Sequence, residues 1–409
     1  MPEAIFNVII IGGGVVGLAT GRELLQRFPD SKLLIVEKEQ ALAAHQTGHN
    51  SGVIHSGLYY KPGSLKARLC VAGAARMVQF CKENAIPYEL CGKVVVATDV
   101  TEIPALEELY RRGIANGVPN LRMLNAEQIR EIEPHASGIR GIHVPGTGIT
   151  DFTAVAQKYA EHIRAAGGEI QTGAAVTGIV RQNGLNIVQT KAGDFPGKLV
   201  INCAGLYSDT LARRAGATLA IQNVPFRGEY YDLKPDKTHL VKGLIYPVPD
   251  PRFPFLGVHF TKRIYGKADA GPNAVLALAR EGYSKTTINF GEAMETLRWP
   301  GFRKMARKYW RAGLGEFYRS FSKAAFVRAL QKLIPEITAN DLVTGGTGVR
   351  TQALEMDGKL MDDFAFVFQE GQVHIVNVPS PAATASLEVA REIVTRVFNS
   401  ADQAKHTEA

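Results

Sequence analysis

Three glycines close to the amino terminus have the spacing that suits a dinucleotide phosphate. Gly12, Gly14 and Gly17 form a G-x-G-x-x-G motif between an apolar run and a helix-like stretch. Gly12 permits a tight turn, Gly14 lets the backbone approach a pyrophosphate, and Gly17 allows close packing of helix against strand. Glu37 ends the next apolar run, at the distance where an acidic side chain accepts hydrogen bonds from an adenosine ribose. These four residues predict a site for the ADP part of a cofactor.

A second segment, at positions 46–52, is rich in hydroxyl, amide and glycine residues. Its sequence is Gln-Thr-Gly-His-Asn-Ser-Gly, and two apolar residues then lead to His55. Such a composition suits a loop that wraps a phosphate or a ring better than an element of the core. The loop residues that we expect at the cofactor are Thr47, Gly48, His49, Asn50, Ser51 and Gly52.

The elements that must position these residues indicate an α/β fold. Residues 4–11 are typical of a buried strand of a parallel sheet, residues 15–28 of a helix and residues 32–36 of a second strand. A later strand, ending at residue 201, leads into Asn-Cys-Ala-Gly at 202–205. Small residues after a strand let the backbone approach a ligand closely.

The chain changes character between residues 222 and 261, where short alternating strands are interspersed with prolines. This pattern predicts an antiparallel sheet in a separate domain. Residues 291–333 are expected to be helical and basic, and the glycine-rich run at 345–350 is expected to begin a return to the first domain. A turn at 379–384 then leads into a last helix, expected over residues 382–398.

The chain has 409 residues, of which 45% are hydrophobic and 21% charged, so it is long enough for two domains with separate cores. No run reaches the roughly 20 apolar residues of a membrane-spanning helix. The first strand begins too near the amino terminus to leave room for a signal peptide, so we expect a cytoplasmic location. The four cysteines form no C-x-x-C pair and are expected to be reduced thiols, and no pattern predicts a metal site.

A single strand–glycine–helix motif of this kind is present, and this bears on the cofactor. An enzyme that carries both FAD and NAD(P)H usually has two such motifs. A nicotinamide-dependent dehydrogenase usually completes its nucleotide domain soon after the motif, whereas this chain leaves the domain early and is expected to return twice. The interrupted layout fits an extended cofactor held by several loops, and it favours FAD over a nicotinamide.

Several longer motifs, in order along nearly the whole chain, resemble the L-2-hydroxyglutarate oxidase/dehydrogenase family of the D-amino-acid-oxidase-like FAD superfamily. The most specific is Gly-His-Asn-Ser-Gly-Val-Ile-His-Ser-Gly at 48–57, which continues into Leu-Tyr-Tyr-Lys-Pro-Gly. The other matching stretches are residues 203–209, 225–230, 246–250, 253–261, 271–275 and 379–384. The chain departs from the family pattern at Thr351, where alanine is usual, and at residues 268–270.

The resemblance implies a discontinuous Rossmann-like FAD-binding domain made of residues 1–90, 146–220 and 340–409. It also implies an α+β substrate domain made of residues 91–145 and 221–339, whose mixed or antiparallel sheet covers the flavin. The implied reaction is oxidation of L-2-hydroxyglutarate to 2-oxoglutarate by non-covalent FAD, with electrons passed to a membrane quinone chain or to oxygen.

Further residues are expected at the cofactor beside the two glycine-rich segments. The stretch around Val176 is placed beside the adenine in this interpretation, although it suits an ordinary strand equally well. The other expected contacts come from residue 38, from the small residues after residue 203 and from the last turn. They are Lys38, Ala204, Gly205, Gly348, Ser380, Pro381, Ala382, Ala383 and Thr384.

Oxidation of a 2-hydroxy acid needs a hydride acceptor, which is the flavin, a base for the hydroxyl proton and cations for the carboxylates. A neutral histidine is the natural base near pH 7. His55 follows the glycine-rich loop and His259 lies on a predicted strand of the substrate domain. Both are expected to line the substrate cavity, and either can be the base. His49 is expected to hold the flavin loop and His374 to be structural.

A five-carbon diacid needs positive charge at both ends. Arg350 is expected to bind one carboxylate with both nitrogens of its guanidinium. Tyr60, Lys61 and Arg227 are candidates for the remaining contacts. A structural role between the domains is an equal alternative for Arg227.

The net charge of +8 is concentrated between Arg298 and Lys332, where ten basic residues and interleaved aromatic residues face a single acid, Glu316. A basic, aromatic, helix-like segment of this kind predicts binding to an anionic membrane surface, at the inner face of the cell membrane, with access to a quinone. The alternative is a set of helices packed on the substrate domain with a solvated basic face. No nucleic-acid-binding module is recognisable, so no nucleic acid partner is expected. The rival function within the same fold is an FAD-dependent amine or amino-acid oxidase.

Overall fold

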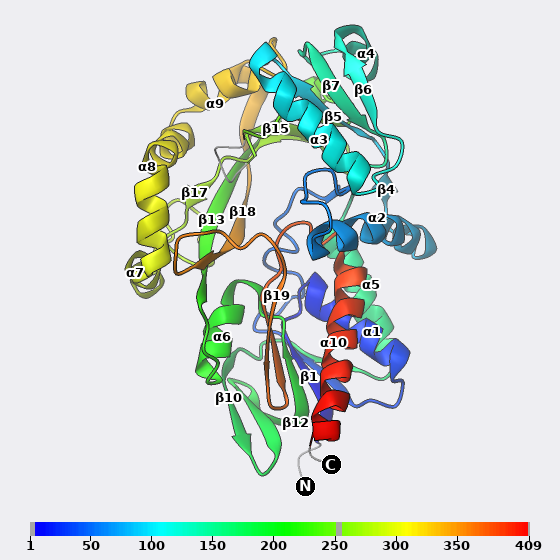
Figure 1. Cartoon of the computed structure of the whole chain (residues 1–409), viewed down its shortest axis with the longest axis vertical. Helices are drawn as coiled ribbons and strands as arrows, with labels where there is room; N and C mark the ends of the chain where they lie inside the picture. Colours follow the sequence, from blue (N-terminus) through cyan, green and yellow to red (C-terminus); the bar gives the residue numbers. More distant parts are fainter. Residues whose placement is uncertain (1–4, 251–255, 408–409) are drawn as a thin grey trace.

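Two large sheets and a small third one form the framework of the molecule (Figure 1). The computed structural model describes residues 5–250 and 256–407. Pro251, Pro254 and the first three residues of the 253–261 motif therefore lie outside the described residues.

The first sheet is built around β1 (Phe6–Ile11). This strand pairs in parallel with β2 on one side and with β12 on the other, and β20 pairs in parallel with β12. The sheet is extended by β9, by the antiparallel strands β10 and β11, and by β19. The strand bounds are β2 Leu33–Val36, β9 Glu169–Gln171, β10 Val176–Gln182, β11 Leu185–Thr190, β12 Gly193–Asn202, β19 Ala365–Gln369 and β20 Gln372–Asn377.

Both faces of β1 are covered, which explains why five of its six residues are apolar and buried. Val8 and Ile10 pack in the cluster formed by four helices on one face, whereas Ile9 and Ile11 pack against the β10–β12 side of the sheet. The helices are α1 Val15–Arg27, α2 Leu65–Glu83, α5 Phe152–Ala165 and α10 Ser386–Thr407. α10 therefore begins four residues later than expected and continues beyond residue 398.

The second sheet occupies the other half of the molecule, shown at the top of Figure 1. Its order is β17-β13-β16-β15-β14-β5-β7-β6, with β18 paired to β13. The pairing is antiparallel except between β14 and β5, so the sheet is mixed. The strand bounds are β5 Lys93–Ala97, β6 Arg122–Asn125, β7 Arg140–Val144, β13 Ile221–Leu233, β14 Leu244–Pro247, β15 His259–Lys262, β16 Ala268–Gly271, β17 Val275–Leu276 and β18 Leu342–Glu355.

The chain returns to the first sheet later than expected, because the glycine-rich run at 345–350 was expected to begin this return. That run lies inside β18, which pairs with β13 from Ile221 opposite Glu355 to Leu233 opposite Leu342. The chain rejoins the first sheet only at β19 and β20. The domain limits derived from the sequence stay a prediction, and a division that follows the sheets would place residues 342–355 with the second one.

The remaining elements connect or flank the two sheets. The small sheet contains β3 (Val53–Ile54), β8 (Gly148–Thr150) and β4 (Tyr88–Glu89). The other helices are α3 Ile103–Ala115, α4 Ala126–Ile132, α6 Ser208–Arg214, α7 Phe290–Arg298, α8 Pro300–Phe321 and α9 Lys323–Leu330. Short 3-10 turns occupy Val100–Glu102, Gly205–Tyr207, Pro235–Leu240 and Ala339–Asp341. Within the described residues, no helix is long and apolar enough to cross a membrane.

Candidate functional site

A cavity of about 1180 Å³ extends from the ends of β1, β2 and β12 to the face of the second sheet. The ends of parallel strands are where open α/β sheets bind their ligands. Most residues predicted for the site line this cavity. They are Gly12, Gly14, Glu37, Lys38, Thr47, His49, Asn50, Ser51, His55, Tyr60, Val176, Ala204, Gly205, Arg227, His259, Arg350, Ser380, Pro381, Ala382, Ala383 and Thr384. Gly17, Gly48, Gly52, Lys61 and Gly348 are not part of its wall.

The turn between β1 and α1 depends on glycine at two positions. Gly12 has a φ of +113°, and a Cβ added there would lie 2.5 Å from the carbonyl oxygen of Cys203. A Cβ added at Gly17 would lie 2.1 Å from the carbonyl oxygen of Gly12, so helix and turn touch through backbone. Gly14, Val15 and Val16 at the amino end of α1 line the cavity, and the amino end of a helix fits a pyrophosphate.

The acidic residue expected at the ribose is fixed by backbone donors. The Glu37 carboxylate accepts hydrogen bonds from the N–H groups of Gly13, at 2.6 Å, and Glu39, at 2.9 Å. Each carboxylate oxygen can accept a further bond. Because Glu37 also lines the cavity, it is held in place for the hydroxyl groups of a ribose.

Lys38 lies at the same end of the cavity in a cluster of charges. Its ammonium is 2.6 Å from Glu39 and 2.5 Å from Glu281, and His45 is 2.8 Å from the same Glu39 oxygen. Glu39, His45 and Glu281 are close enough to one another to hold a metal ion. The Lys38 ammonium already forms ion pairs with both carboxylates, and it therefore competes with a metal ion for them.

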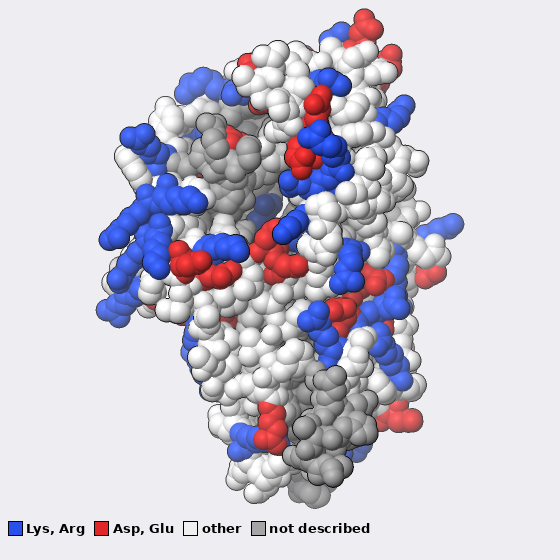
Figure 2. Space-filling view, in the orientation of Figure 1, with Lys and Arg blue, Asp and Glu red and all other residues white. Residues whose placement is uncertain are grey.

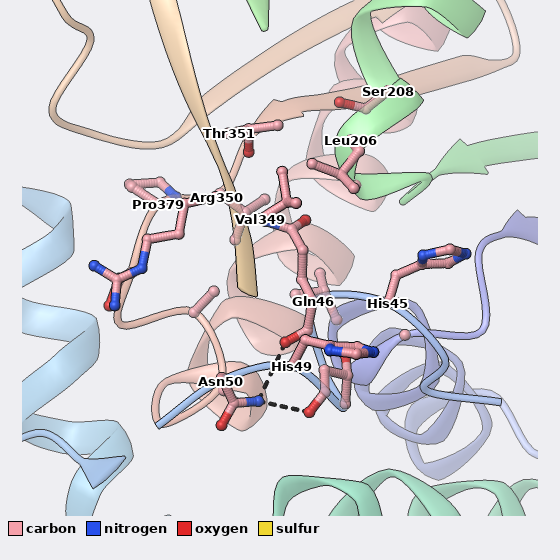
Figure 3. Close-up of a pocket in the computed structure, with 18 of the residues that line it drawn as sticks. His45, Gln46, His49, Asn50, Leu206, Ser208, Val349, Arg350, Thr351 and Pro379 are labelled. Carbon is pink, nitrogen blue, oxygen red and sulfur yellow. Dashed lines mark hydrogen bonds between the residues drawn. The ribbon is translucent and has the colours of Figure 1, made fainter. Parts of the chain in front are cut away.

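The 46–52 loop is held together by the Asn50 side chain (Figure 3). Its amide donates to the carbonyl oxygens of Gln46, at 3.2 Å, and Thr47, at 2.5 Å, and its own oxygen accepts the Gly52 N–H at 2.8 Å. The Thr47 hydroxyl accepts the Val15 N–H at 3.0 Å, which ties the loop to the first turn of α1. These hydrogen bonds therefore fix the loop as part of the cavity wall.

The two arginines predicted at the substrate differ in what they already bind. The Arg227 guanidinium donates twice to Glu229, at 3.1 and 3.0 Å, and to the Ser284 carbonyl oxygen at 3.0 Å. Arg350 extends from β18 and is exposed to the cavity (Figure 3), and it donates at 3.3 Å to the Tyr230 hydroxyl. No carboxylate in the described part of the chain forms an ion pair with Arg350.

His55 and His259 both face the cavity, from the loop after β3 and from β15. Burial, aided by the charges of Lys93 and Arg350 and by His259, lowers the pKa of His55 to about 3. Burial and the charge of Arg350 also lower the pKa of His259 to about 3, although a bond to the Gly257 carbonyl oxygen opposes this. Both rings are therefore neutral at pH 7.

The two histidines differ in their hydrogen bonds. His259 Nδ1 lies 2.9 Å from the Gly257 carbonyl oxygen. A carbonyl oxygen can only accept, so Nδ1 carries the hydrogen and Nε2 keeps a lone pair. His55 Nδ1 is buried and has no hydrogen-bond partner among the described residues.

Other residues of the cavity wall were not predicted from the sequence. They include Tyr59, Lys66 and Tyr246, with Lys93 directly behind them. Tyr59 and Tyr246 lie inside motifs that were recognised, but nothing in the sequence separates them from ordinary core aromatics. Lys93 could have been noticed in the sequence, because it is a charged residue at the start of a strand that is otherwise apolar.

Comparison with known proteins shows the family of the chain. The sequence profile of the FAD-dependent oxidoreductase family matches residues 7–396. The L-2-hydroxyglutarate dehydrogenase of Indibacter alkaliphilus is 53% identical over 385 residues, covering 94% of this chain and 96% of that protein. The mitochondrial L-2-hydroxyglutarate dehydrogenase of Homo sapiens is 46% identical, covering 96% and 88%.

Among solved structures, the L-alpha-glycerophosphate oxidase of Mycoplasma pneumoniae with FAD bound has a TM-score of 0.78 at 24% identity. The match covers 96% of this chain and 94% of that one. It confirms the predicted α/β fold with a mixed second sheet. By its fold, its family profile and its relatives, the chain belongs to the FAD-dependent oxidoreductases and, among them, to the L-2-hydroxyglutarate dehydrogenase family.

Proposed function

We propose that this enzyme oxidises L-2-hydroxyglutarate to 2-oxoglutarate. The proposal rests mainly on one observation. Arg350, His55 and His259 line the same cavity, which also includes the glycine turn that fits a pyrophosphate. The activity in the names of the relatives at 53% and 46% identity supports the same substrate.

FAD, bound without a covalent link, would supply the acceptor for the hydride that leaves C2 of the substrate. The residues of the chain must bind two carboxylates, orient C2 and accept the hydroxyl proton. Arg350 binds the carboxylate next to C2, because its guanidinium has no competing anion and can form two parallel hydrogen bonds. Arg227 is already occupied by Glu229, so we assign it the structural role.

We assign the base to His259. The hydrogen bond from Nδ1 to Gly257 leaves the Nε2 lone pair free to accept the hydroxyl proton. In the ligand-free cavity a pKa of about 3 makes this ring a weak base. A substrate carboxylate beside Arg350 offsets the positive charge that lowers this pKa, so binding of the substrate strengthens the base. We assign to His55, whose Nδ1 has no partner among the described residues, the orientation of the hydroxyl group.

At the other end of the substrate we assign Tyr60, on which the Lys66 ammonium packs at 4.9 Å from the ring centroid. Lys66 in turn bonds to Asp362 at 2.9 Å. Lys61 is exposed and outside the cavity wall, which makes it a weaker choice than Tyr60.

The function is tested by reduction of the purified flavoprotein under anaerobic conditions. L-2-hydroxyglutarate should bleach the flavin absorbance, whereas its D enantiomer and a panel of amino acids should not. Bleaching by an amino acid, or by sarcosine as a secondary amine, would favour the rival amine or amino-acid oxidase instead. No bleaching by L-2-hydroxyglutarate would contradict the proposal.

We also propose that α7 and α8 bind an anionic membrane surface, from which electrons pass to a quinone, with oxygen as a slower acceptor. Figure 2 shows Lys and Arg side chains gathered along the edge where Figure 1 places these helices. The exposed basic residues of α8 include Arg303, Lys304, Arg307, Lys308 and Arg311. Large apolar side chains are exposed beside them, with Phe290 at 82%, Trp310 at 55% and Phe321 at 77%. Basic and aromatic residues together favour an interfacial helix.

Co-sedimentation with vesicles tests this surface. The protein should bind vesicles rich in phosphatidylglycerol more tightly than neutral phosphatidylcholine vesicles. Replacement of Arg307, Lys308 and Arg311 by Gln should remove the preference. The matched control replaces Lys32, Lys191 and Lys198, which are exposed on the first sheet, and should bind as the parent does. Equal binding to both lipids would support a solvated basic face instead.

A further inference from the structure

A lysine is buried in the second sheet, behind the substrate end of the cavity. Lys93 is the first residue of β5 and is 2% exposed. Its Nζ lies 4.5 Å from the ring centroid of Tyr59 and 5.2 Å from that of Tyr246. Both tyrosines line the cavity, whereas Lys93 does not. The ammonium is therefore separated from the cavity by two aromatic rings.

The charge of this lysine is not balanced by an anion. No carboxylate in the described ranges forms an ion pair with it, and ring faces replace hydration only in part. Burial accordingly lowers the pKa of Lys93 to about 7. Its charge also reaches the cavity, since it contributes to the lowered pKa of both His55 and His259.

Polar atoms around the rings also lack partners. The Tyr59 hydroxyl and His55 Nδ1 are buried and have no hydrogen-bond partner among residues 5–250 and 256–407. Buried polar groups normally have hydrogen-bond partners. An oxygen-rich ligand in this part of the cavity would provide a partner for both atoms. An anionic ligand would in addition lie near an unbalanced positive charge.

We propose that Lys93 is a positioning residue that selects a dianionic substrate, by holding the Tyr59 and Tyr246 rings and by adding a second positive charge to that of Arg350. The inference rests on the proposed function and deepens it. A monoanion needs one cation and is served by Arg350 alone. A dianion keeps a second carboxylate in the cavity, and this carboxylate is stabilised by the charge of Lys93.

The test compares two ligands of the same length on the intact holoenzyme. Calorimetric titration gives the Kd of 2-oxoglutarate, a dianion, and of 2-oxovalerate, a monoanion. In Lys93→Met the preference for 2-oxoglutarate should fall about tenfold or more. The Kd of 2-oxovalerate and the FAD content should stay close to those of the parent, and Lys93→Arg should restore the preference.

A matched control is present in α9, the helix that packs on the same sheet. Lys323 lies 5.6 Å from the Tyr231 ring centroid and donates to the Leu342 carbonyl oxygen, outside the cavity wall. Lys323→Met should leave the ratio of the two Kd values unchanged. An equal loss of affinity for both ligands in Lys93→Met would mean a packing role only and would overturn the inference. Failure of L-2-hydroxyglutarate to reduce the parent flavin would instead contradict the proposed function.

A second measurement needs no change to Lys93. Below pH 7 the free protein already carries the charged lysine, so the Kd of 2-oxoglutarate should be constant. Above pH 7 binding must take up a proton, so this Kd should rise by up to tenfold per pH unit, and that of 2-oxovalerate should rise less. A parallel rise for both ligands, or none, would overturn the inference.

Asp269, three strands away from Lys93 in the same sheet, also has a pKa in this range. Burial raises the pKa of Asp269 to about 7, so the titration is repeated with Asp269→Asn, which should keep the same pH dependence. The titratable and charged residues around Lys93 are Cys70 and Lys66 of α2, His55 and Tyr59 of the loop after β3, Tyr246 of β14, His259 of β15 and Arg350 of β18.

Discussion

Arg350 and Arg227 show how strongly the role of a residue depends on its partners. They lie on paired strands, with Arg350 opposite Phe226 and Arg227 opposite Val349. One guanidinium is held by a buried carboxylate, and the other faces the cavity and donates to a tyrosine hydroxyl. The same side chain thus supports the sheet in one strand and is free to bind an anion in the next.

Replacement of Arg350 by Lys should raise KM for L-2-hydroxyglutarate at least tenfold, because one point charge replaces a bidentate pair worth about 1.5–3 kcal/mol. The bound flavin should remain, as measured by its absorbance per protein. Arg227→Lys is the matched variant. It should mainly lower the melting temperature, since Glu229 loses a two-point contact. Normal substrate affinity in Arg350→Lys would contradict its assignment.

The two histidines can be separated by the rate of flavin reduction in anaerobic stopped flow. His259→Gln should slow reduction about 10²–10⁴-fold, the usual contribution of a general base. His55→Gln should have a smaller effect. His374→Gln, in the first sheet, should change stability and not the rate, because its ring bonds to Asn202 and Gln369. If neither cavity variant slows reduction while FAD stays bound, both assignments are wrong.

At the level of single residues, the sequence predicted which residues line the cavity better than it predicted what each of them binds. Most of the predicted residues line one cavity, but the Arg227–Glu229 pair and the exclusion of Lys61 from the wall depend on how the strands meet. Lys93 was missed for the same reason. Its importance comes from two rings contributed by other segments, and no local pattern reveals them.

Among the elements, the β1–turn–α1 unit was predicted almost completely. Its signals are local, since an apolar strand, three spaced glycines and a helix lie within thirty residues of sequence. β18 was more difficult, because a glycine-rich run gives no hydrophobic alternation that identifies its sheet. Its pairing with β13 is fixed by contacts between segments more than a hundred residues apart.

Gly17→Ala should weaken FAD binding, because the new methyl group would lie 2.1 Å from the Gly12 carbonyl oxygen and must push α1 away from the turn. We expect a loss of stability of about 1–3 kcal/mol and a lower FAD content after purification. Gly313→Ala, in α8, is the control. A Cβ at Gly313 meets nothing within 4 Å, so this change should leave FAD content unaltered and stabilise the helix slightly. Full FAD occupancy in Gly17→Ala would contradict the close-packing role.

On the scale of the whole molecule, a buried ion pair links α6 to the segment after β17. Arg280 is 3% exposed and Asp209 is fully buried, and their atoms lie 2.7 and 3.2 Å apart in a two-point contact. Arg280 also donates to the Leu206 carbonyl oxygen at 2.6 Å. Removal of Asp209 leaves the buried guanidinium with only the partly exposed Glu295 as an ion-pair partner among the described residues.

Asp209→Asn should therefore destabilise the protein by about 3 kcal/mol or more in chemical denaturation. Glu295 provides the comparison, because its carboxylate is 40% exposed and lies 3.4 Å from the same guanidinium. Glu295→Gln should cost under about 1 kcal/mol, as exposed pairs usually do. Equal effects of the two changes would show that burial does not decide the strength of this contact.

The order in which the chain visits its two sheets has a consequence for the integrity of the molecule. It passes from β2 to β5, back to β9, on to β13 and finally to β19 and β20. A protease that cuts one of these connections leaves the others intact, so neither sheet can separate from the cavity that both of them enclose. Several chain crossings therefore join the two sheets, and a ligand bound between them should be retained after a single backbone cut.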